Sequence, residues 1–380
     1  MLAPSWTERV TLPAVPAVGD AAPQLSAFKD QLPVLAAMEA CEQDPVHHAE
    51  GNVLIHTQMV CDQLVAHPVW KTLDPQAREE LWWAAVLHDC GKPQTTRMED
   101  GRLRSPGHAT AGAVLARRLL WQAGVAPARR ERVCGLVRWH MTPYHLLDRP
   151  DPQRTAIELS LDVRADQLAV LVESDARGRA AADGDRLVDE LQLFSVFCDE
   201  LGCLTGPYPF ASDHARVSFF RREDRDPSWA AFDDSRCELT VLSGLPGAGK
   251  DFWAGAHADG RKVISLDDLR RERKVRRGDQ KAQGQMIAAA RELLRDELRH
   301  GRDVIWNATN LSRQQRAPVL GLAADYNARV RVICVEADPA RLRTQNRDRP
   351  HPVKEAAIED MLRRWEFPSL ADAHAVQTVS

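Results

Sequence analysis

A short apolar segment that leads into a glycine-rich turn and then into a helix restricts the fold of this chain more than any other feature. Residues 238–243 are expected to form a strand, residues 244–249 read GLPGAG, and a helix is expected to begin near Lys250. Further strands are expected at residues 262–265, 303–306 and 329–335, with helices between them at residues 282–300 and 313–326. Strands that alternate with helices predict a parallel sheet in an α/β domain.

The part of the chain before this point has a different pattern. From about residue 45 to residue 200, apolar residues recur at helical spacing, and breaks rich in Pro and Gly separate the segments. No alternation typical of strands is convincing there, so this part is predicted to be all-α. We therefore expect a multidomain protein with an N-terminal extension (1–44), a helical domain (45–203), a connector (204–237) and an α/β domain (238–380).

Composition excludes several classes of protein. Apolar residues make up 44% of the chain and charged residues 27%, as in soluble globular proteins. No apolar run approaches the ~20 residues that cross a bilayer, and no secretory signal is visible, so we expect no membrane contact. The eight cysteines form no CxxC pair, which favours reduced thiols and a cytoplasmic location. A net charge of −4 excludes a globally basic nucleic-acid binder but allows local basic patches.

Histidines and aspartates end several of the apolar helical faces in the predicted helical domain. His56 shares a helical stripe with Val60 and Leu64. His88, His140 and Asp175 each follow apolar residues at helical spacing, so all four residues are predicted to point inward. Because a buried charge without a partner costs several kcal/mol or more, such groups need partners, and a divalent metal ion suits both imidazole and carboxylate. The alternative is a set of core histidines and capping aspartates with protein partners. His47, His48, His67 and His145 are expected at the surface, and Cys90 is expected to be a small buried filler.

The strings AAVLHDCGKP, GHATAG, LVRWHM and LVESDARG, in this order, resemble the HD phosphohydrolase superfamily, and within it the HD domains attached to tRNA nucleotidyltransferases. The resemblance implies one or two ions of the Mn, Fe, Co, Ni or Zn class. The first ion would be held by His56, His88, Asp89 and Asp175. Asp89 would bridge to a second ion that also takes His108 and His140, although a one-ion site could dispense with these two histidines. Lys92 would bind a non-bridging phosphate oxygen.

The glycine-rich turn has the context of a phosphate-binding P-loop, because it follows a strand and precedes a helix. Backbone N–H groups of such a loop cradle phosphates, here from Gly244, Gly247, Ala248 and Gly249. Lys250 would bridge the β- and γ-phosphates of ATP. Asp251 stands where a Ser or Thr hydroxyl normally binds Mg²⁺, and a carboxylate can coordinate that ion too.

An aspartate and a basic run follow the second expected strand of the α/β domain. Asp267 is placed to accept the proton of an attacking hydroxyl, with a plain helix N-cap as the alternative. The run Arg270–Arg277 comes directly after it, which favours a polyanionic acceptor over a solvated charged face.

These strings resemble the P-loop end-healing kinases related to the phage polynucleotide 5′-kinase. The resemblance implies that Lys250 binds ATP phosphates, that Asp267 is the general base, and that Arg349, with Arg347 second, stabilises the transition state. It implies contacts to the acceptor by Arg270, Thr309, Asn310 and Arg313. Ala308 departs from the family pattern, which has Asp at that position before Thr and Asn.

An HD domain followed by a polynucleotide-kinase-like domain resembles the bacterial bifunctional RNA end-healing proteins called HD-Pnk. The resemblance implies an enzyme that phosphorylates a 5′-OH with ATP and Mg²⁺, removes 2′ or 3′ phosphates and opens 2′,3′-cyclic phosphates. Its partners would be RNA or DNA ends, a nucleoside triphosphate and a separate ligase, with the oligomeric state open. One alternative is an HD nucleotide phosphohydrolase with a regulatory ATP-binding domain. Another is a non-catalytic RNA- or nucleotide-binding protein with degenerate sites.

Overall fold

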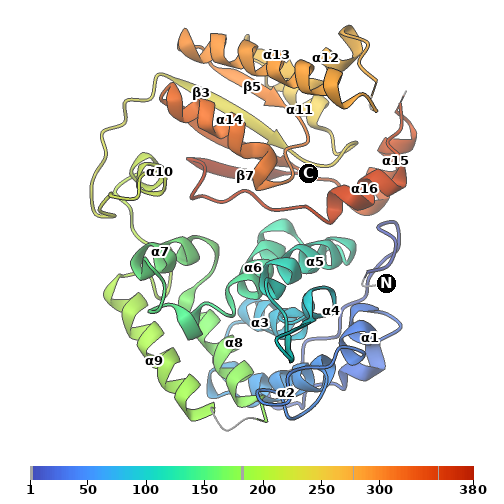
Figure 1. Cartoon of the computed structure of the whole chain (residues 1–380), viewed down its shortest axis with the longest axis vertical. Coiled ribbons are helices and arrows are strands. Elements are labelled where there is room, and N and C mark those ends of the chain that lie inside the picture. The colour runs from blue at the N-terminus through green and yellow to red at the C-terminus, as the bar shows by residue number, and fades with distance from the viewer. Residues whose placement is uncertain (1–2, 181–183, 277, 350) are drawn as a thin grey trace. The chain divides into compact units, whose positions relative to one another are not determined.

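The computed structural model describes residues 3–180, 184–276, 278–349 and 351–380 and divides the chain into two units, Met1–Pro209 and Phe210–Ser380 (Figure 1). The division falls inside the stretch 204–237 that was expected to connect the domains. The first 44 residues belong to the first unit, and Leu25, Leu32 and Leu35 are fully buried in its apolar core. These residues therefore contribute to the packing of the helical unit.

The first unit is built almost entirely from helices. Polar caps begin several of them, since the side chains of Asn52, Asp74 and Asp151 each accept a hydrogen bond from a backbone N–H three residues ahead. The helices are α1 (Val34–Glu39), α2 (Val53–Ala66), α3 (Pro75–Leu87), α4 (Lys92–Thr95), α5 (His108–Gln122), α6 (Pro127–Trp139), α7 (Pro152–Asp162), α8 (Ala165–Arg177) and α9 (Gly184–Glu200), with 3-10 turns η1 (Leu25–Phe28), η2 (Pro68–Lys71) and η3 (Pro143–His145).

One short hairpin departs from the all-α expectation for this part of the chain. Strands β1 (Arg97–Glu99) and β2 (Arg102–Arg104) pair antiparallel, and Arg97 lies opposite Arg104. Asp100 and Gly101 connect them with φ angles of +50° and +76°, as a two-residue Asp-Gly hairpin turn requires. The strands are short and mostly polar, so no alternation of apolar residues marked them.

Two glycines let the helices of the first unit approach closely. A Cβ on Gly91 would lie 2.1 Å from the carbonyl oxygen of His108, so only glycine allows the segment after α3 to touch the start of α5. A Cβ on Gly178 would lie 2.8 Å from the backbone nitrogen of Val60, which brings the end of α8 against α2. Both contacts bring the backbones of separate segments together.

The second unit is the expected α/β domain, with a five-stranded parallel sheet in the order β4-β5-β3-β6-β7. Its strands are β3 (Cys237–Ser243), β4 (Lys262–Ser265), β5 (Val304–Asn307), β6 (Ala328–Val335) and β7 (Ala375–Val379). Its helices are α10 (Asp213–Arg221), α11 (Lys250–Ala256), α12 (Leu266–Glu272), α13 (Gln280–Arg299), α14 (Arg313–Asp325), α15 (Pro339–Arg347) and α16 (Glu355–Leu362).

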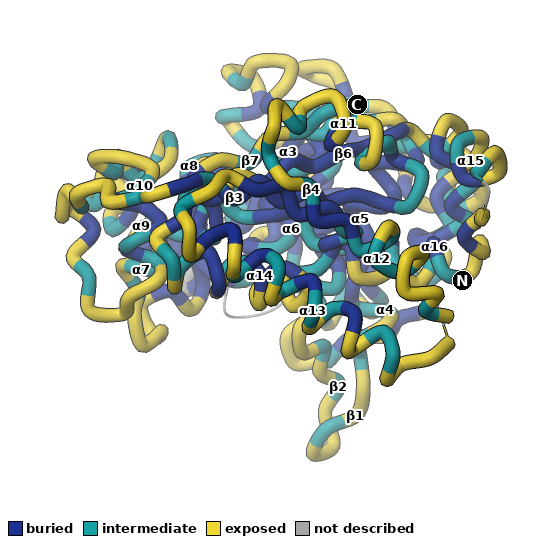
Figure 2. The backbone as a smooth tube through the Cα atoms, turned by 90° about the horizontal axis from the view of Figure 1, so that it is seen from above, coloured by how far each residue is buried: buried dark blue, intermediate teal, exposed yellow. Residues whose placement is uncertain are grey.

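The central strand of this sheet is the one that ends in the glycine-rich turn. β3 is almost wholly buried (Figure 2), and in the sheet it lies between β5 and β6. Because all strands run parallel, the carboxyl ends of β3, β4 and β5 meet at one edge, where ligands bind in open α/β sheets. The four expected strands lie within one residue of the observed ones, and β7 was not expected. Among the described residues, no helix is long and apolar enough to cross a membrane.

Candidate functional site

The six predicted metal ligands of the first unit come together at the ends of five helices. Nε2 of His56 lies 3.0 Å from Oδ1 of Asp175. Nε2 of His88 lies 3.3 Å from Oδ2 of Asp89, and Nε2 of His108 lies 3.4 Å from Oδ1 of the same carboxylate. The ligand atoms fall into two groups, His56 with His88 and Asp175, and Asp89 with His108 and His140. The two oxygens of Asp89 face different groups, as a bridging ligand requires.

The backbone fixes which ring nitrogen of each histidine faces this cluster. In His88, His108 and His140, Nδ1 lies 2.7–2.8 Å from the carbonyl oxygen three residues earlier. Because a carbonyl oxygen can only accept, each Nδ1 carries the proton and each Nε2 presents a lone pair. Such a hydrogen bond is the usual support of a metal-binding histidine.

Lone pairs therefore face each other at the centre of the cluster. Nε2 of His108 lies 3.2 Å from Nε2 of His140. Nε2 of His88 and Oδ1 of Asp89 are buried and have no hydrogen-bond partner among the residues that the structure describes. Acceptor atoms that point at one another in a buried place repel unless a cation lies between them. The donor set therefore fits divalent metal ions.

The protonation states of this cluster are largely those of metal ligands. Burial alone would raise the pKa of Asp89, but Lys92, His88 and His108 together outweigh burial and hold that pKa well below the usual range. Burial also raises the pKa of Asp175, but Arg179, His56 and His88 together outweigh it and hold that pKa well below the usual range. Burial lowers the pKa of His140 to about 3, so its imidazole is neutral. His56 differs: burial lowers its pKa, but Asp175 and other carboxylate contacts outweigh burial and raise it.

The sequence analysis missed several residues that support this centre. Glu50 accepts from Nδ1 of His56 at 3.0 Å and from Nδ1 of His48 at 2.8 Å. The prediction that His48 is a surface residue was wrong, since its side chain is 11% exposed. Tyr144 donates to Oδ2 of Asp175 at 3.0 Å, and Arg179 lies 2.6 Å from the same oxygen. Residues 44–50 lie outside helices and strands, so no periodicity marked His48 and Glu50.

The contact between Glu50 and His56 leads to a testable prediction about metal binding. Glu50→Gln is expected to weaken metal binding by about 10- to 100-fold, because His56 loses the charged acceptor that orients its ring. Titration of metal-free protein with Mn²⁺ or Zn²⁺ in a calorimeter measures the dissociation constant. Glu200→Gln, at an exposed position at the end of α9, is the control. Equal affinities for the Glu50 variant and the wild type would contradict the assigned role.

A pocket of about 400 Å³ adjoins the His and Asp cluster. Lys92 and His108 line its inner side, and Arg179 and His48 also contribute. Nζ of Lys92 lies 2.7 Å from Oδ2 of Asp89 and donates to Oε1 of Gln43 at 2.7 Å. The predicted phosphate-binding lysine therefore lies between the cluster and an open cavity, where an anionic group can reach it.

In the second unit, the glycine-rich turn forms the loop expected of a phosphate-binding site. A Cβ on Gly244 would lie 2.2 Å from the carbonyl oxygen of Val335, so glycine is required where the loop leaves β3. Gly249 has a φ of +105° and immediately precedes α11, which begins at Lys250. Nζ of Lys250 donates to the carbonyl oxygens of Gly244 and Leu245, both at 2.9 Å.

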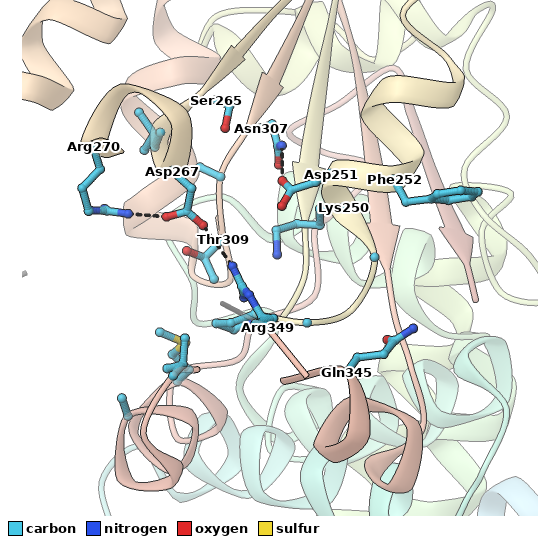
Figure 3. A pocket seen from close by; sticks show the side chains of 18 of the residues that line it. Lys250, Asp251, Phe252, Ser265, Asp267, Arg270, Asn307, Thr309, Gln345 and Arg349 are labelled. Atoms are coloured by element: carbon cyan, nitrogen blue, oxygen red, sulfur yellow. Dashed lines mark hydrogen bonds and ion pairs between the residues drawn. The ribbon is translucent and has the colours of Figure 1, made fainter. Parts of the chain in front are cut away.

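A pocket of about 500 Å³ opens over this loop (Figure 3). Gly247, Gly249, Lys250 and Asp251 line it, whereas Gly244 and Ala248 of the predicted set do not. Nδ2 of Asn307, at the end of β5, donates to Oδ1 of Asp251 at 2.7 Å. The Asp251 carboxylate is therefore held in place at the pocket wall, where a Mg²⁺ ion would meet it.

The predicted base and two predicted arginines lie together on the same pocket. Arg270 hydrogen-bonds Asp267, and Nη2 of Arg349 lies 3.5 Å from Oδ2 of Asp267 (Figure 3). Thr309 lines the pocket beside them. Arg347, the second choice for the transition state, has a side chain that is 74% exposed, pairs with Asp348 and lines neither this pocket nor the basic groove described below.

Two residues predicted to bind substrate, Asn310 and Arg313, do not line this pocket. Asn310 is buried, and its Nδ2 donates to the carbonyl oxygen of Leu242 at 2.7 Å, so it ties its loop to β3. Arg313 begins α14, has a 64% exposed side chain and lies 3.4 Å from Asp372. Neither residue lines the pocket. Position in a motif did not show which way each side chain faces.

A basic groove of about 820 Å³ continues from the pocket and shares Asp267 with it. The groove is lined by Asp251, Asp267, Arg270, Arg271, Lys274, Val275, Arg276, Arg349 and His351. Most of the basic run predicted from the sequence therefore lines a cavity, which favours a polyanionic ligand over a purely solvated face.

Burial of Lys250 leads to an expected pH dependence of ATP binding. Burial lowers the pKa of Lys250 to about 8, and the charges of Asp251 and Asp267 oppose that shift. Since ATP needs the protonated ammonium, its dissociation constant is expected to rise about tenfold per pH unit above pH 8. Fluorescence titration from pH 7 to 10 measures it. Lys250→Arg keeps its charge and should remove the dependence; a flat wild-type profile would contradict the assignment.

Comparison with known proteins places a family on each unit. A family model of the HD domain matches residues 52–171, and one of the AAA domain matches residues 239–368. The first range contains the metal cluster except Asp175, and the second contains the glycine-rich loop and the basic groove.

Three curated relatives align with part of the chain. They are the CC-adding tRNA nucleotidyltransferase of Thermus thermophilus (39% identical over 155 residues, 40% of this chain and 32% of the relative), the Multifunctional CCA protein of Halorhodospira halophila (32% over 168 residues, 42% and 37%) and the A-adding tRNA nucleotidyltransferase of Deinococcus radiodurans (33% over 170 residues, 43% and 37%). The chain spans about a third of the length of these relatives. The chain is thus a helical HD domain followed by an α/β domain of the P-loop type.

Proposed function

We propose that this chain is a bifunctional RNA end-healing enzyme, with a polynucleotide 5′-kinase in the second unit and a metal-dependent 2′,3′-phosphatase and cyclic phosphodiesterase in the first. One observation carries the proposal. Asp267 lines both the phosphate-loop pocket and the basic groove. A carboxylate shared by a nucleotide site and a polyanion site is what phosphoryl transfer between the two requires.

The kinase step follows from the residues around Asp267. ATP phosphates would lie on the loop with Lys250, and the strand carrying the 5′-OH would lie in the basic groove. As the hydroxyl oxygen bonds to the γ-phosphorus, Asp267 takes its proton and the bond to the β-phosphate oxygen breaks, which releases ADP. Arg349, which lies beside Asp267, would neutralise charge on the transferred group.

The phosphatase step would take place at the His and Asp cluster. When bound, divalent ions supply activated water and neutralise phosphate charge there. Lys92 binds a non-bridging oxygen of the terminal phosphate, which its place between Asp89 and the pocket allows. Water oxygen bonds to phosphorus, the bond to the 3′ or 2′ ribose oxygen breaks, and that oxygen takes up a proton. Opening of a cyclic phosphate breaks only one of its two ester bonds.

The relatives favour RNA as the nucleic acid. Two of them carry tRNA in their names, and all three are named as nucleotidyltransferases or as CCA proteins. Those names describe proteins about three times longer than the matched region. We therefore take from them the RNA substrate and not the nucleotidyl-transfer activity.

An HD nucleotide phosphohydrolase with a regulatory ATP-binding domain is the alternative. A regulatory site needs neither a carboxylate in the pocket over the phosphate loop nor a basic groove beside it, and the second unit has both. A non-catalytic binding protein is disfavoured by the cluster of unpaired ligand atoms around Asp89.

The decisive experiment uses an oligoribonucleotide with a 5′-OH and a 2′,3′-cyclic phosphate, incubated with ATP, Mg²⁺ and Mn²⁺. Mass spectrometry of the product reads both termini. The proposal expects a 5′-phosphate that depends on ATP and a 3′ end that loses its phosphate without ATP. A changed 3′ end with an unchanged 5′-OH would support the regulatory alternative, and two unchanged ends would overturn the proposal.

A further inference from the structure

The β1–β2 hairpin carries two arginines to the pocket beside the metal centre. Arg102 and Arg104 of β2 line this pocket together with Lys92 and Arg179. The hairpin is largely exposed, as its yellow and teal colouring in Figure 2 shows. The cavity thus extends from the buried cluster to a basic rim on a separate element.

The four lysine and arginine residues that line the pocket differ in what they already bind. Lys92 lies 2.7 Å from Asp89, Arg179 lies 2.6 Å from Asp175, and Arg102 lies 2.8 Å from Asp44. The Arg104 side chain forms no hydrogen bond or ion pair with the part of the chain that the structure describes, although its backbone lies in the ladder with β1. Its guanidinium is exposed and free to bind a ligand anion, and a phosphodiester oxygen pair matches its geometry.

A substrate with a single phosphate uses only the inner part of this pocket. Its phosphate reaches the cluster and Lys92, and nothing in it reaches the hairpin with a negative charge. A strand end carries a second negative charge, in the phosphodiester that precedes the terminal nucleoside. That charge lies one nucleoside away from the terminal phosphate.

We propose that Arg104 binds the phosphodiester that precedes the terminal phosphate, so that the first unit acts on strand ends in preference to free mononucleotides. The inference rests on the proposed phosphatase function and specifies its substrate class. The Asp-Gly turn holds β2 against β1, so the guanidinium is presented from a fixed backbone.

The test uses two dinucleotides with a 3′-phosphate, one with a phosphodiester linkage and one with an uncharged methylphosphonate linkage. The wild type is expected to hydrolyse the phosphodiester compound with a kcat/KM about tenfold higher, as a charged hydrogen bond implies. In Arg104→Ala this ratio should fall to near one. Activity on the methylphosphonate compound reports whether the site of the variant is intact.

Arg97→Ala is the matched control. Arg97 lies directly opposite Arg104 in the hairpin, pairs with Glu99 and does not line the pocket, so its removal should leave the tenfold ratio unchanged. On longer strands, log kcat/KM should decrease with the logarithm of the salt concentration. The magnitude of this slope should be smaller by about 0.7, the value of one single-strand phosphate contact, in Arg104→Ala and unchanged in Arg97→Ala.

Three outcomes would count against the inference. A wild-type ratio near one, or a ratio that Arg104→Ala leaves at tenfold, overturns it while the phosphatase activity stands. Wild-type protein that hydrolyses neither dinucleotide overturns the proposed phosphatase and this inference with it.

Discussion

Asp89→Asn protein is expected to lose removal of 3′-phosphate by more than about a hundredfold, since loss of a direct metal ligand exceeds the 10- to 100-fold cost of losing a supporting one. One oxygen of Asp89 faces His88, and the other faces His108 and His140. The amide keeps the shape of the carboxylate but removes its charge. Its N–H group points toward one of the two groups of ligand atoms. The metal content of the protein, measured by mass spectrometry of the ion, and the rate of phosphate release should both fall.

The same preparation contains its own control, because phosphorylation of a 5′-OH by the second unit should stay at the wild-type rate. Asp62→Asn, which removes an exposed carboxylate from α2, should change neither activity. Asp89→Asn protein that keeps its metal and its phosphatase rate would refute the bridging role.

Asp267→Asn is expected to reduce phosphoryl transfer to a 5′-OH by about 10²- to 10⁴-fold, the range for loss of a general base. The amide cannot take the hydroxyl proton, while the loop and Lys250 that hold ATP are unchanged. Transfer of labelled phosphate from ATP to an oligoribonucleotide measures the first effect. The dissociation constant of ATP, measured by titration, should change by less than about threefold.

The neighbouring carboxylate provides a close control for this variant. Asp268 is on the same helix, hydrogen-bonds Arg271 and lines neither the pocket nor the groove. Asp268→Asn should therefore retain transfer. If both variants transfer phosphate normally, Asp267 only pairs with Arg270 and Arg349. If Asp267→Asn loses ATP binding as well, its role is structural.

The arrangement of the second unit could be read from its sequence because the signals are local. A strand that runs into a glycine turn and a helix has few solutions, and the observed β3, loop and α11 follow the expected bounds closely. β7 was missed because Ala375–Val379 mixes small, polar and apolar residues and forms an edge strand that packs on β6 alone. An edge strand needs fewer apolar residues, so its sequence predicts it only weakly.

The metal cluster was accessible from sequence for a different reason. His56, His88, His140 and Asp175 each lie at one end of an apolar helical face whose periodicity predicts an inward direction. Asp89 and His108 had no such face and were placed by their order in the motif. Helical periodicity could not predict Glu50 or Arg104, because Glu50 lies outside helices and strands and Arg104 lies on a three-residue strand. Asn310 had the motif position but a positive φ of +47° turned its side chain inward.

The convergence of ligands from α2, α3, α5, α6 and α8 has a consequence for the integrity of the first unit. A cation held there would act as a cross-link between segments up to 119 residues apart, the separation of His56 and Asp175. Because it would bind only the assembled fold, it would add about 2.7 kcal/mol to the free energy of unfolding at a concentration one hundred times its dissociation constant. Chelators would then do more than stop turnover: they would loosen the helix ends and expose backbone amides there to solvent exchange.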